Sequence, residues 1–340
     1  MKSFGFTKAE KILLAIIIFL ALVLAFLYLS ENIKERAKIG EKEELYKLYE
    51  NRSYYMLKIS ENRKLVFEFV PNYESVYYGD AIKINGTQIN INGDGFRDRN
   101  FSVEKPNGIY RIIALGDSFT FGSGVELNET YSKVLETELN KGKSNFSYEV
   151  LNMGVIIYST ENEVEFLKVK GLKYSPDIVM VGYLPNDVEN ITRLNDIKYH
   201  LSEELIKKGQ EIDIFTSEIH TPATIELHKE MEGKSFDEIF RIVKIPLEEL
   251  NTLSKDNKFK VVIVYFPVEG FFEAEKQREE VERTSLQNGW CFIDLTQLYS
   301  EQDLYSQVFG KEDRHPNAYA HKIIGEEIAK KIKECNLLPE

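Results

Sequence analysis

An α/β fold with a five-stranded parallel sheet is predicted for most of this chain, and two observations predict it. Beyond Pro106, short apolar runs alternate with stretches whose apolar residues recur at helical spacing. The apolar runs are continuous rather than alternating, as is typical of parallel strands that helices cover on both faces. Parallel strands joined by helices require right-handed crossovers, so the sequence predicts a doubly wound domain of three layers.

The elements of this domain follow one another in alternation over residues 109–337. The predicted strands are Tyr110–Leu115, Tyr148–Met153, Asp177–Tyr183, Lys260–Phe266 and Cys291–Leu295. The predicted helices are Thr130–Leu139, Thr160–Leu172, a long section within Asp187–Leu253, Phe271–Gln287 and Pro316–Cys335. This order is typical of a flavodoxin-like three-layer sandwich, in which ligands bind beyond the carboxyl ends of the strands. Functional residues are therefore expected at that edge of the sheet.

The composition excludes several classes of protein. With 43 basic and 55 acidic side chains among 340 residues, the formal net charge is −12, which argues against a nucleic-acid partner because such binding needs clustered Lys and Arg. Two cysteines, Cys291 and Cys335, exclude a disulfide-rich scaffold and a four-cysteine zinc site but are compatible with one disulfide. His315 and His321 lack the i, i+4 spacing of a helical zinc pair, so no metal and no cofactor are expected.

The N-terminus contains a candidate membrane anchor within residues 1–30. Residues Ile12–Leu29 are apolar or aromatic throughout. At about 1.5 Å per residue, a helix of this run covers roughly 27 Å, close to the thickness of a bilayer core. A cleaved signal peptide and a buried soluble helix are the alternatives, but the run is longer than a signal-peptide core and no small-x-small cleavage pattern follows it. We expect an uncleaved single-pass anchor.

The orientation of this anchor is less clearly encoded. Lysines flank the apolar run on both sides, so the positive-inside rule does not decide it. Asn-x-Ser/Thr sequences favour an exported body, although an Asn-rich chain produces such matches by accident. They begin at Asn51, Asn85, Asn100, Asn128, Asn145 and Asn190. We therefore expect the α/β domain on the extracytoplasmic side of the membrane.

Two segments connect the anchor with the α/β domain. Residues 31–60 begin with many charges and carry apolar residues at near-helical spacing, which predicts a helical stalk. Residues 61–108 change character, because VFEFV alternates and because Asn85-Gly86 and Asn92-Gly93-Asp94-Gly95 are turn signals between short β-prone runs. A small β-rich segment that packs on the following domain is expected here.

A glycine-rich segment follows the first predicted strand of the domain. Its sequence, GDSFTFGSG from Gly116, is compatible with a phosphate-binding loop or with a turn that presents a nucleophilic serine. The Gly-Lys-Ser/Thr ending of the phosphate loop and the glycine spacing of the dinucleotide fingerprint are both missing. Gly116 permits a tight turn, and Ser118 would then project at the carboxyl edge of the sheet beside backbone N–H groups. A helix-capping role for this serine is the alternative.

A serine hydroxyl needs a base to remove its proton, and the chain has five histidines. His315 directly precedes Pro316, a favoured first residue of a helix, so the helix dipole would keep the imidazole neutral and able to accept a proton. Asp313 is a candidate to orient the ring, and Glu312 is its rival. The other histidines are expected in solvated or half-buried positions: His200, His220, His228 and His321.

A third polar group follows the predicted strand Asp177–Tyr183. Asn186 would lie at the same edge of the sheet as Ser118, and its side-chain amide is a neutral donor suited to a developing oxyanion. An Asn that caps a loop before a helix is the alternative. The common placement of Ser118, His315 and Asn186 favours a catalytic site.

These segments resemble the SGNH hydrolases, also called GDSL-like lipases and acylhydrolases. Gly116–Gly122 resembles the first sequence block of that family, Asn186-Asp187 the third and Asp313–Asn317 the fifth. The resemblance extends from about Asn92 to Ile332. The segment that precedes the domain, NGDGFRD from Asn92, looks like the corresponding segment of the membrane-anchored or exported branch of the family.

The resemblance implies a role for each candidate residue. Ser118 would be the nucleophile, His315 its base and Asp313 the partner of the base. Asn186 and the Ser118 backbone N–H would form the oxyanion hole, completed by the N–H of the residue at position 157.

The second block, Asn152–Thr160, departs from the family at that residue. Ile157 stands where the family usually has a second glycine. It still carries an N–H, but a β-branched residue resists positive φ, so a reshaped loop is expected. Loss of one oxyanion donor typically costs about 10²- to 10³-fold in rate, so a reshaped loop would weaken or alter the activity, and the sequence does not decide whether it does.

The predicted chemistry is acyl transfer through a covalent serine intermediate. The leading hypothesis is an anchored ester hydrolase that acts outside the membrane on an acylated glycan or another small ester. The alternatives are an O-acyltransferase that passes the acyl group to a sugar hydroxyl at the same site, and a catalytically silent glycan-binding or scaffold protein. No oligomeric state is predicted.

Overall fold

The computed structural model describes residues 56–62, 64–77, 86–142, 145–188, 233–268, 270–308 and 314–339, all within a unit that spans Ser53–Glu340. The predicted membrane anchor, the predicted stalk up to residue 55 and the connection 189–232, which holds His200, His220 and His228, lie outside these ranges. Within the described ranges, no helix has the length and apolar character needed to cross a bilayer.

The five-stranded parallel sheet predicted from the sequence is present. Its strands are β5 (Ile109–Gly116), β6 (Ser147–Asn152), β7 (Ile178–Tyr183), β8 (Lys260–Tyr265) and β9 (Cys291–Asp294), in the order β6-β5-β7-β8-β9. Every neighbouring pair is parallel. The central strand β7 is buried along its whole length, which explains its continuous apolar sequence. The order changes direction between β5 and its two neighbours, so ligands are expected above the carboxyl end of β5.

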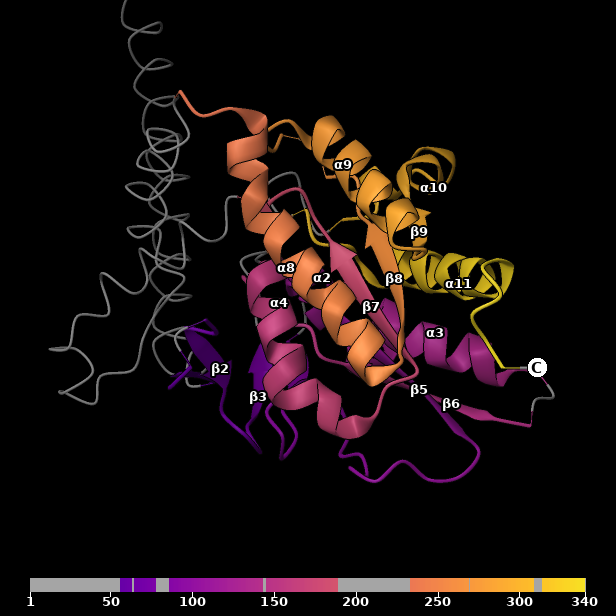
Figure 1. Cartoon of the computed structure of the whole chain (residues 1–340). Helices are drawn as coiled ribbons and strands as arrows, with labels where there is room; N and C mark the ends of the chain where they lie inside the picture. The colour runs from indigo at the N-terminus through magenta and orange to yellow at the C-terminus, as the bar shows by residue number, and fades with distance from the viewer. Residues whose placement is uncertain are drawn as a thin grey trace, which may run out of the picture. The chain divides into compact units, whose positions relative to one another are not determined.

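Helices cover both faces of the sheet (Figure 1). They are α2 (Ser118–Phe121), α3 (Tyr131–Asn140), α4 (Thr160–Phe166), α8 (Phe236–Asn257), α9 (Ala274–Gln287), α10 (Thr296–Glu301) and α11 (Ala318–Glu334). Short helical turns follow α4 over Leu167–Gly171 and Leu172–Tyr174, and others span Leu127–Glu129 and Leu304–Ser306. The last helix was predicted to begin at Pro316, but it begins two residues later because the side chain of Asn317 accepts a hydrogen bond from the Ala320 N–H and caps it.

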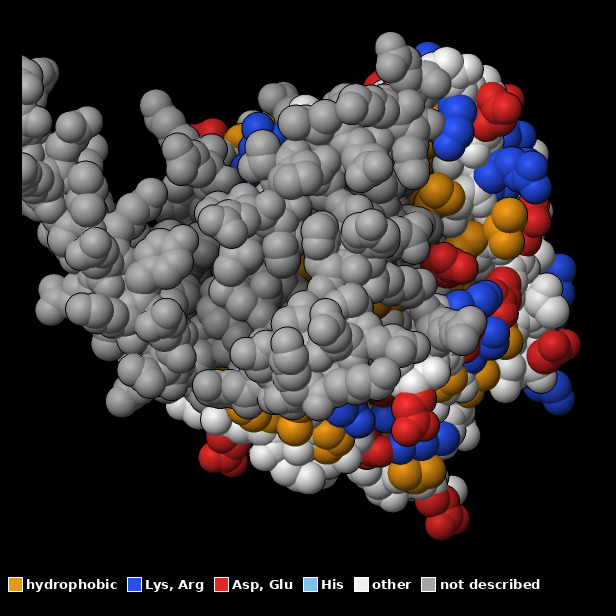
Figure 2. Space-filling model, turned by 90° about the vertical axis from the view of Figure 1, so that its left-hand side faces the viewer, with side chains coloured by type: hydrophobic (Ala, Val, Ile, Leu, Met, Phe, Trp, Pro, Cys, Tyr) orange, Lys and Arg blue, Asp and Glu red, His pale blue; other side chains and the backbone are white. Residues whose placement is uncertain are grey.

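The alternation of side chains along β5 divides the core into two layers. Ile113 and Leu115 pack on the face that α4, α8 and α9 cover. Ile112 and Ala114 pack on the opposite face, under α3, α10 and α11. The disulfide Cys291–Cys335 joins the first residue of β9 to the residue after α11. On the described surface in Figure 2, acidic and basic side chains are interspersed with hydrophobic ones.

The β-rich segment before the domain consists of two antiparallel strand pairs. One pairs β1 (Leu57–Ile59) with β2 (Phe67–Phe69), and the other pairs β3 (Glu74–Tyr77) with β4 (Thr87–Asn90). The helical stalk was predicted to extend to residue 60, but Leu57–Ile59 form the strand β1 instead. The apolar strand β2 gives these residues a partner for backbone hydrogen bonds, and local helical spacing does not reveal such a partner.

Candidate active site

The turn that follows β5 presents Ser118 at the carboxyl edge of the sheet. Ser118 is the first residue of α2, and the Asp117 side chain accepts a hydrogen bond from the Phe119 N–H at 2.9 Å, which caps this single helical turn. Gly116 has a φ of +155°, and a Cβ there would lie 1.9 Å from the Thr120 Oγ1. A side chain at position 116 would collide with Thr120, so only glycine permits the turn that presents Ser118.

His315 lies against this serine, as predicted. The distance from His315 Nε2 to Ser118 Oγ is 2.8 Å, although 197 residues separate the two along the chain. The imidazole ring also packs beside the Phe119 ring, with centroids 5.4 Å apart. A bridge between Pro316 and Val308 holds the segment that carries the histidine. The hydroxyl and the imidazole are within the range that proton transfer requires.

The acidic partner of the histidine stays a prediction. Asp313 and its rival Glu312 both lie outside the described residues.

Asn186 lies at the same edge of the sheet, in the loop after β7. Its Nδ2 donates a hydrogen bond to Asp117 Oδ2 at 3.2 Å, so the residue that caps the Ser118 turn also orients this amide. An amide nitrogen carries two hydrogens, and one remains for a substrate oxygen after the bond to Asp117 is made. The structure therefore brings Ser118, His315 and Asn186 to one place.

Ile157 adopts the conformation that glycine would take. Its φ is +69°, so the expectation of a loop reshaped to avoid positive φ is wrong. The Tyr158 N–H closes the turn on the Val155 carbonyl at 3.1 Å, and the Val155 N–H donates to the Gly116 carbonyl at 2.9 Å. The half-buried Ile157 side chain also packs on the core. These contacts offset a local backbone cost of about 1–2 kcal/mol.

Three buried carboxyl groups, those of Asp117, Glu163 and Asp187, lie close enough to influence one another, and burial raises the pKa of each. Burial raises the pKa of Asp117, although the hydrogen bonds from Phe119 and Asn186 oppose this. Burial, and then the neighbouring Asp187 and Asp117, raise the pKa of Glu163 well above its ordinary value. Burial also raises the pKa of Asp187 well above its usual range.

Asp187 and Glu163 are functional candidates that sequence reasoning did not single out. Asp187 Oδ2 accepts hydrogen bonds from the Thr160 N–H at 3.1 Å and from the Thr160 hydroxyl, which ties the end of β7 to the start of α4. Asp187 was visible beside Asn186 in the third sequence block. Glu163 lies inside a helix and has no sequence signal, because only the fold brings it beneath the site.

His321 is not a second base. It was expected at the surface or half buried, but it is only 1% exposed because α11 packs against α3. Its Nδ1 accepts a hydrogen bond from the Tyr131 N–H at 3.2 Å. Burial, and to a lesser degree Arg97 and His315, lower the pKa of His321 to about 3, so the ring is neutral. In the described part of the chain, no three His, Cys, Asp or Glu side chains cluster so as to hold a metal ion.

A serine within reach of a histidine, beside an amide donor at the carboxyl edge of a parallel sheet, defines a class of protein: the serine hydrolases with a three-layer α/β fold. The sequence profile of one family, "GDSL-like Lipase/Acylhydrolase", matches residues 112–328. The chain belongs to this GDSL-like lipase/acylhydrolase family and is an ester-hydrolysing enzyme. No curated protein matches the chain.

The chain is also similar to several solved structures. A putative lipolytic protein of the G-D-S-L family from Desulfitobacterium hafniense DCB-2 is 15% identical, with 65% of this chain and 98% of that chain covered and a TM-score of 0.42. TesA is 12% identical, with 66% and 99% covered and a TM-score of 0.44. A catalytic mutant of Axe2, an acetylxylan esterase from Geobacillus stearothermophilus, is 15% identical, with 66% and 94% covered and a TM-score of 0.44.

Proposed function

We propose that this chain is a membrane-anchored serine esterase that removes acyl groups from a glycan outside the cytoplasm. The observation that carries the proposal is the 2.8 Å distance between Ser118 Oγ and His315 Nε2 at the carboxyl edge of the sheet. A hydroxyl within hydrogen-bond distance of an imidazole is the arrangement that serine acyl transfer needs.

In the proposed mechanism, His315 takes the proton of Ser118 as the serine oxygen attacks the ester carbonyl. The carbonyl oxygen becomes an oxyanion, which the Asn186 amide and the N–H groups of Ser118 and Ile157 stabilise. His315 then gives the proton to the leaving alcohol, and an acyl-serine remains. Water then attacks this ester while His315 takes a proton from it, and the imidazole returns that proton to the serine oxygen as the acid is released. Asp313 is proposed to orient the ring during both steps.

Three features support action outside the cytoplasm. The apolar run Ile12–Leu29 has the length of a membrane span. The disulfide Cys291–Cys335 fits an oxidising compartment, because thiols are kept reduced in the cytosol. The Asn-x-Ser/Thr sequences fit an exported domain. An esterase anchored at the outer surface of the membrane would encounter glycans that carry acyl esters.

The test of activity compares an aryl acetate, an acetylated glycan and the same glycan with added acceptor sugar. Full-length protein is expected to release acetate from both esters, and Ser118→Ala is expected to lose this activity. If acceptor sugar raises turnover and yields an acylated sugar, the enzyme is an O-acyltransferase. If the folded wild-type protein cleaves neither ester and does not react with a fluorophosphonate, the proposed esterase activity is overturned in favour of a binding or scaffold role.

The test of the anchor is alkaline extraction of membranes from cells that make the full chain. The protein is expected to stay in the membrane pellet. Leu20→Arg combined with Leu22→Arg is expected to move it to the soluble fraction, because two central arginines make insertion unfavourable by several kcal/mol. If wild-type protein is extracted as fully as this variant, the proposed anchor is wrong.

A further inference from the structure

We propose that Arg97 and Asp98, which lie outside the sheet in the segment Asn92–Arg99, are positioning residues for the reaction at Ser118. Arg97 holds the backbone of the nucleophile turn, and Asp98 holds the second sequence block against it. The proposal rests on the proposed function, because it assigns these residues to the placement of that same site.

The segment that carries both residues is a preorganised turn. The Asn92 Oδ1 accepts hydrogen bonds from the backbone N–H groups of Asp94 at 3.0 Å and Phe96 at 3.2 Å. Its Nδ2 donates to the Arg99 carbonyl at 3.0 Å. Gly95 has a φ of +84°, which glycine adopts without strain. One asparagine side chain therefore fixes the backbone from which Arg97 and Asp98 project.

Arg97 is 0% exposed and donates to carbonyl oxygens of the nucleophile segment. Its Nη1 lies 3.0 Å from the Phe121 oxygen and 2.7 Å from the Gly122 oxygen. Its Nη2 lies 2.7 Å from the Val125 oxygen and 3.1 Å from the Gln88 oxygen. Burial lowers the pKa of Arg97 to about 10, so the guanidinium is still charged at neutral pH.

These contacts matter because α2 is a single turn. The last carbonyls of a helix have no partner within it, and they carry the negative end of its dipole. Arg97 supplies donors and positive charge at this end, on Phe121 and Gly122. At the other end, Asp117 caps the turn through the Phe119 N–H. Ser118 thus lies in a helical turn whose two ends are both held by side chains.

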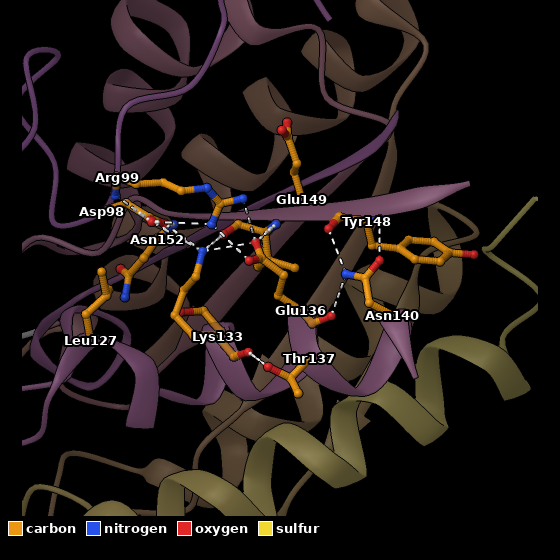
Figure 3. A network of polar contacts seen from close by, with 12 residues as sticks. Asp98, Arg99, Leu127, Lys133, Glu136, Thr137, Asn140, Tyr148, Glu149 and Asn152 are labelled. Carbon is orange, nitrogen blue, oxygen red and sulfur yellow. Dashed lines mark hydrogen bonds and ion pairs between the residues drawn. The ribbon is translucent and has the colours of Figure 1, made fainter. Parts of the chain in front are cut away.

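Asp98 contacts Asn152, in the second sequence block, and also Lys133 (Figure 3). Its Oδ2 accepts a hydrogen bond from the Asn152 N–H at 2.9 Å and lies 3.0 Å from Lys133 Nζ. The Asp98 side chain is 1% exposed and that of Lys133 is 9% exposed. Lys133 Nζ also lies 3.0 Å from Glu136 Oε2 and donates to the Val150 carbonyl at 2.6 Å, so Asp98 joins the second block to a buried network of charges.

Asn152 transmits this placement to the nucleophile turn. Its Nδ2 donates to the Thr120 carbonyl at 2.8 Å, and its Oδ1 accepts from the Gly154 N–H at 3.1 Å. The two blocks are so close that a Cβ on Gly154 would lie 2.2 Å from the Phe121 nitrogen. Asp98 therefore fixes the position of Asn152, where the loop that leads to Ile157 begins. A shift of about 1 Å between reacting groups can cost about 10²-fold in rate.

The amino end of the sheet offers matched controls for both residues. Arg111 is also 0% exposed, and it donates to Glu149 at 2.7 Å and to the Tyr174 carbonyl at 2.8 Å. Asp177 accepts from the Arg111 N–H at 2.7 Å and from Lys105 Nζ at 2.7 Å. These contacts repeat the chemistry of Arg97 and Asp98 far from the carboxyl edge.

The experiment compares Arg97→Lys with Arg111→Lys, and Asp98→Asn with Asp177→Asn, in the full-length protein. The readouts are kcat and KM for an aryl acetate, the rate of Ser118 labelling by a fluorophosphonate, and the midpoint of unfolding. Each activity is expressed per mole of folded protein. A lysine ammonium cannot span the carbonyls that the guanidinium fork contacts, so the nucleophile turn should shift in Arg97→Lys.

We expect Arg97→Lys to lower kcat and the labelling rate about 10- to 100-fold, with KM within about threefold of wild type. For Asp98→Asn we expect a loss of about 3- to 10-fold, because the amide keeps one acceptor for Asn152 but loses the charge that pairs with Lys133. Arg111→Lys and Asp177→Asn should lose stability but keep kcat within about threefold.

Two results overturn the proposal. One is that Arg97→Lys and Asp98→Asn keep kcat within threefold, and the other is that the amino-end controls lose as much kcat as they do. If Arg97→Lys does not fold, Asp98→Asn decides between these outcomes. A folded wild type that neither hydrolyses the ester nor reacts with the fluorophosphonate overturns the proposed function, and this proposal with it. An active wild type separates the two failures.

Discussion

The two ends of the sheet use the same interactions for different purposes. Near the carboxyl end, Asp98 joins a lysine ammonium to a strand N–H, and at the amino end Asp177 does the same. Each end also contains a fully buried arginine, Arg97 or Arg111, that donates to backbone carbonyls. The interaction type alone therefore does not indicate function.

The difference lies in what each end leaves strained or unpaired. The amino-end pair is partly solvated, with Asp177 26% exposed. The carboxyl end holds buried carboxyls, among them Glu163 with neither oxygen hydrogen-bonded to a described residue, and Ile157 at positive φ. Strained backbone and buried polar groups without partners are typical of regions where a functional site must be held in one geometry. The comparison teaches that the amino end stabilises the domain and the carboxyl end positions its chemistry.

The largest expected effect is at the carboxyl end. His315→Gln should lower kcat/KM for an aryl acetate by about 10³-fold or more, because Ser118 loses its base. The control is Lys105→Met, which breaks an ion pair at the amino end and should keep kcat/KM within about threefold. Comparable losses in the two variants would remove the distinction between the two ends.

The disulfide tests the amino end, where Cys291 begins β9. Replacing Cys291 and Cys335 together by serine should lower the free energy of unfolding by about 2–4 kcal/mol, because the unfolded chain gains freedom. Denaturant unfolding and ester hydrolysis measure the two properties. A loss of kcat in protein that is still folded would show that the amino end also affects the chemistry.

The pH dependence of stability tests whether the buried Glu163 has a raised pKa in the folded protein. Its pKa is raised in the folded state, so the folded protein binds more protons than the unfolded chain, and stability falls as pH rises above the ordinary glutamate value of 4.5. Glu163→Gln removes this titration. Its melting temperature should match that of wild type near pH 5 and exceed it at pH 8 by about 2 °C or more. Parallel curves for the two proteins would show that Glu163 ionises freely in the fold.

The smallest effect is expected at Ile157. Ile157→Gly and Ile157→Ala both lose the packed side chain, but only glycine relieves the positive φ. The glycine variant should be more stable than the alanine variant by about 1 kcal/mol, with kcat within about threefold of wild type because the loop already has the glycine conformation. A tenfold gain in kcat for glycine would show that isoleucine distorts the oxyanion hole.

Much of the fold could be predicted because its determinants are local. Continuous apolar runs of four to eight residues indicate strands that are buried on both faces, and β7 and β8 begin or end within one residue of the predicted bounds. The Ser118 and His315 pair could be predicted because each residue lies in a short block, a glycine turn after a strand and a histidine before a helix, and both blocks resemble those of the family. Neither inference needed knowledge of side-chain packing.

What could not be predicted depends on contacts between distant segments. His321 is buried because two helices pack together, and the hydrophobic spacing of its own helix does not reveal this. Ile157 adopts positive φ because neighbouring hydrogen bonds and core packing override its intrinsic preference. Arg97 belongs to a turn-forming sequence, and its partners are backbone carbonyls that no residue pattern encodes.

The most direct measurement is mass spectrometry of the full-length protein after reaction with a fluorophosphonate, with the modified residue identified in the digest. A single adduct on Ser118 is the predicted result, formed at least about 10²-fold more slowly when His315 is replaced by glutamine. An adduct on another residue, or equal labelling rates with and without the imidazole, would contradict the account.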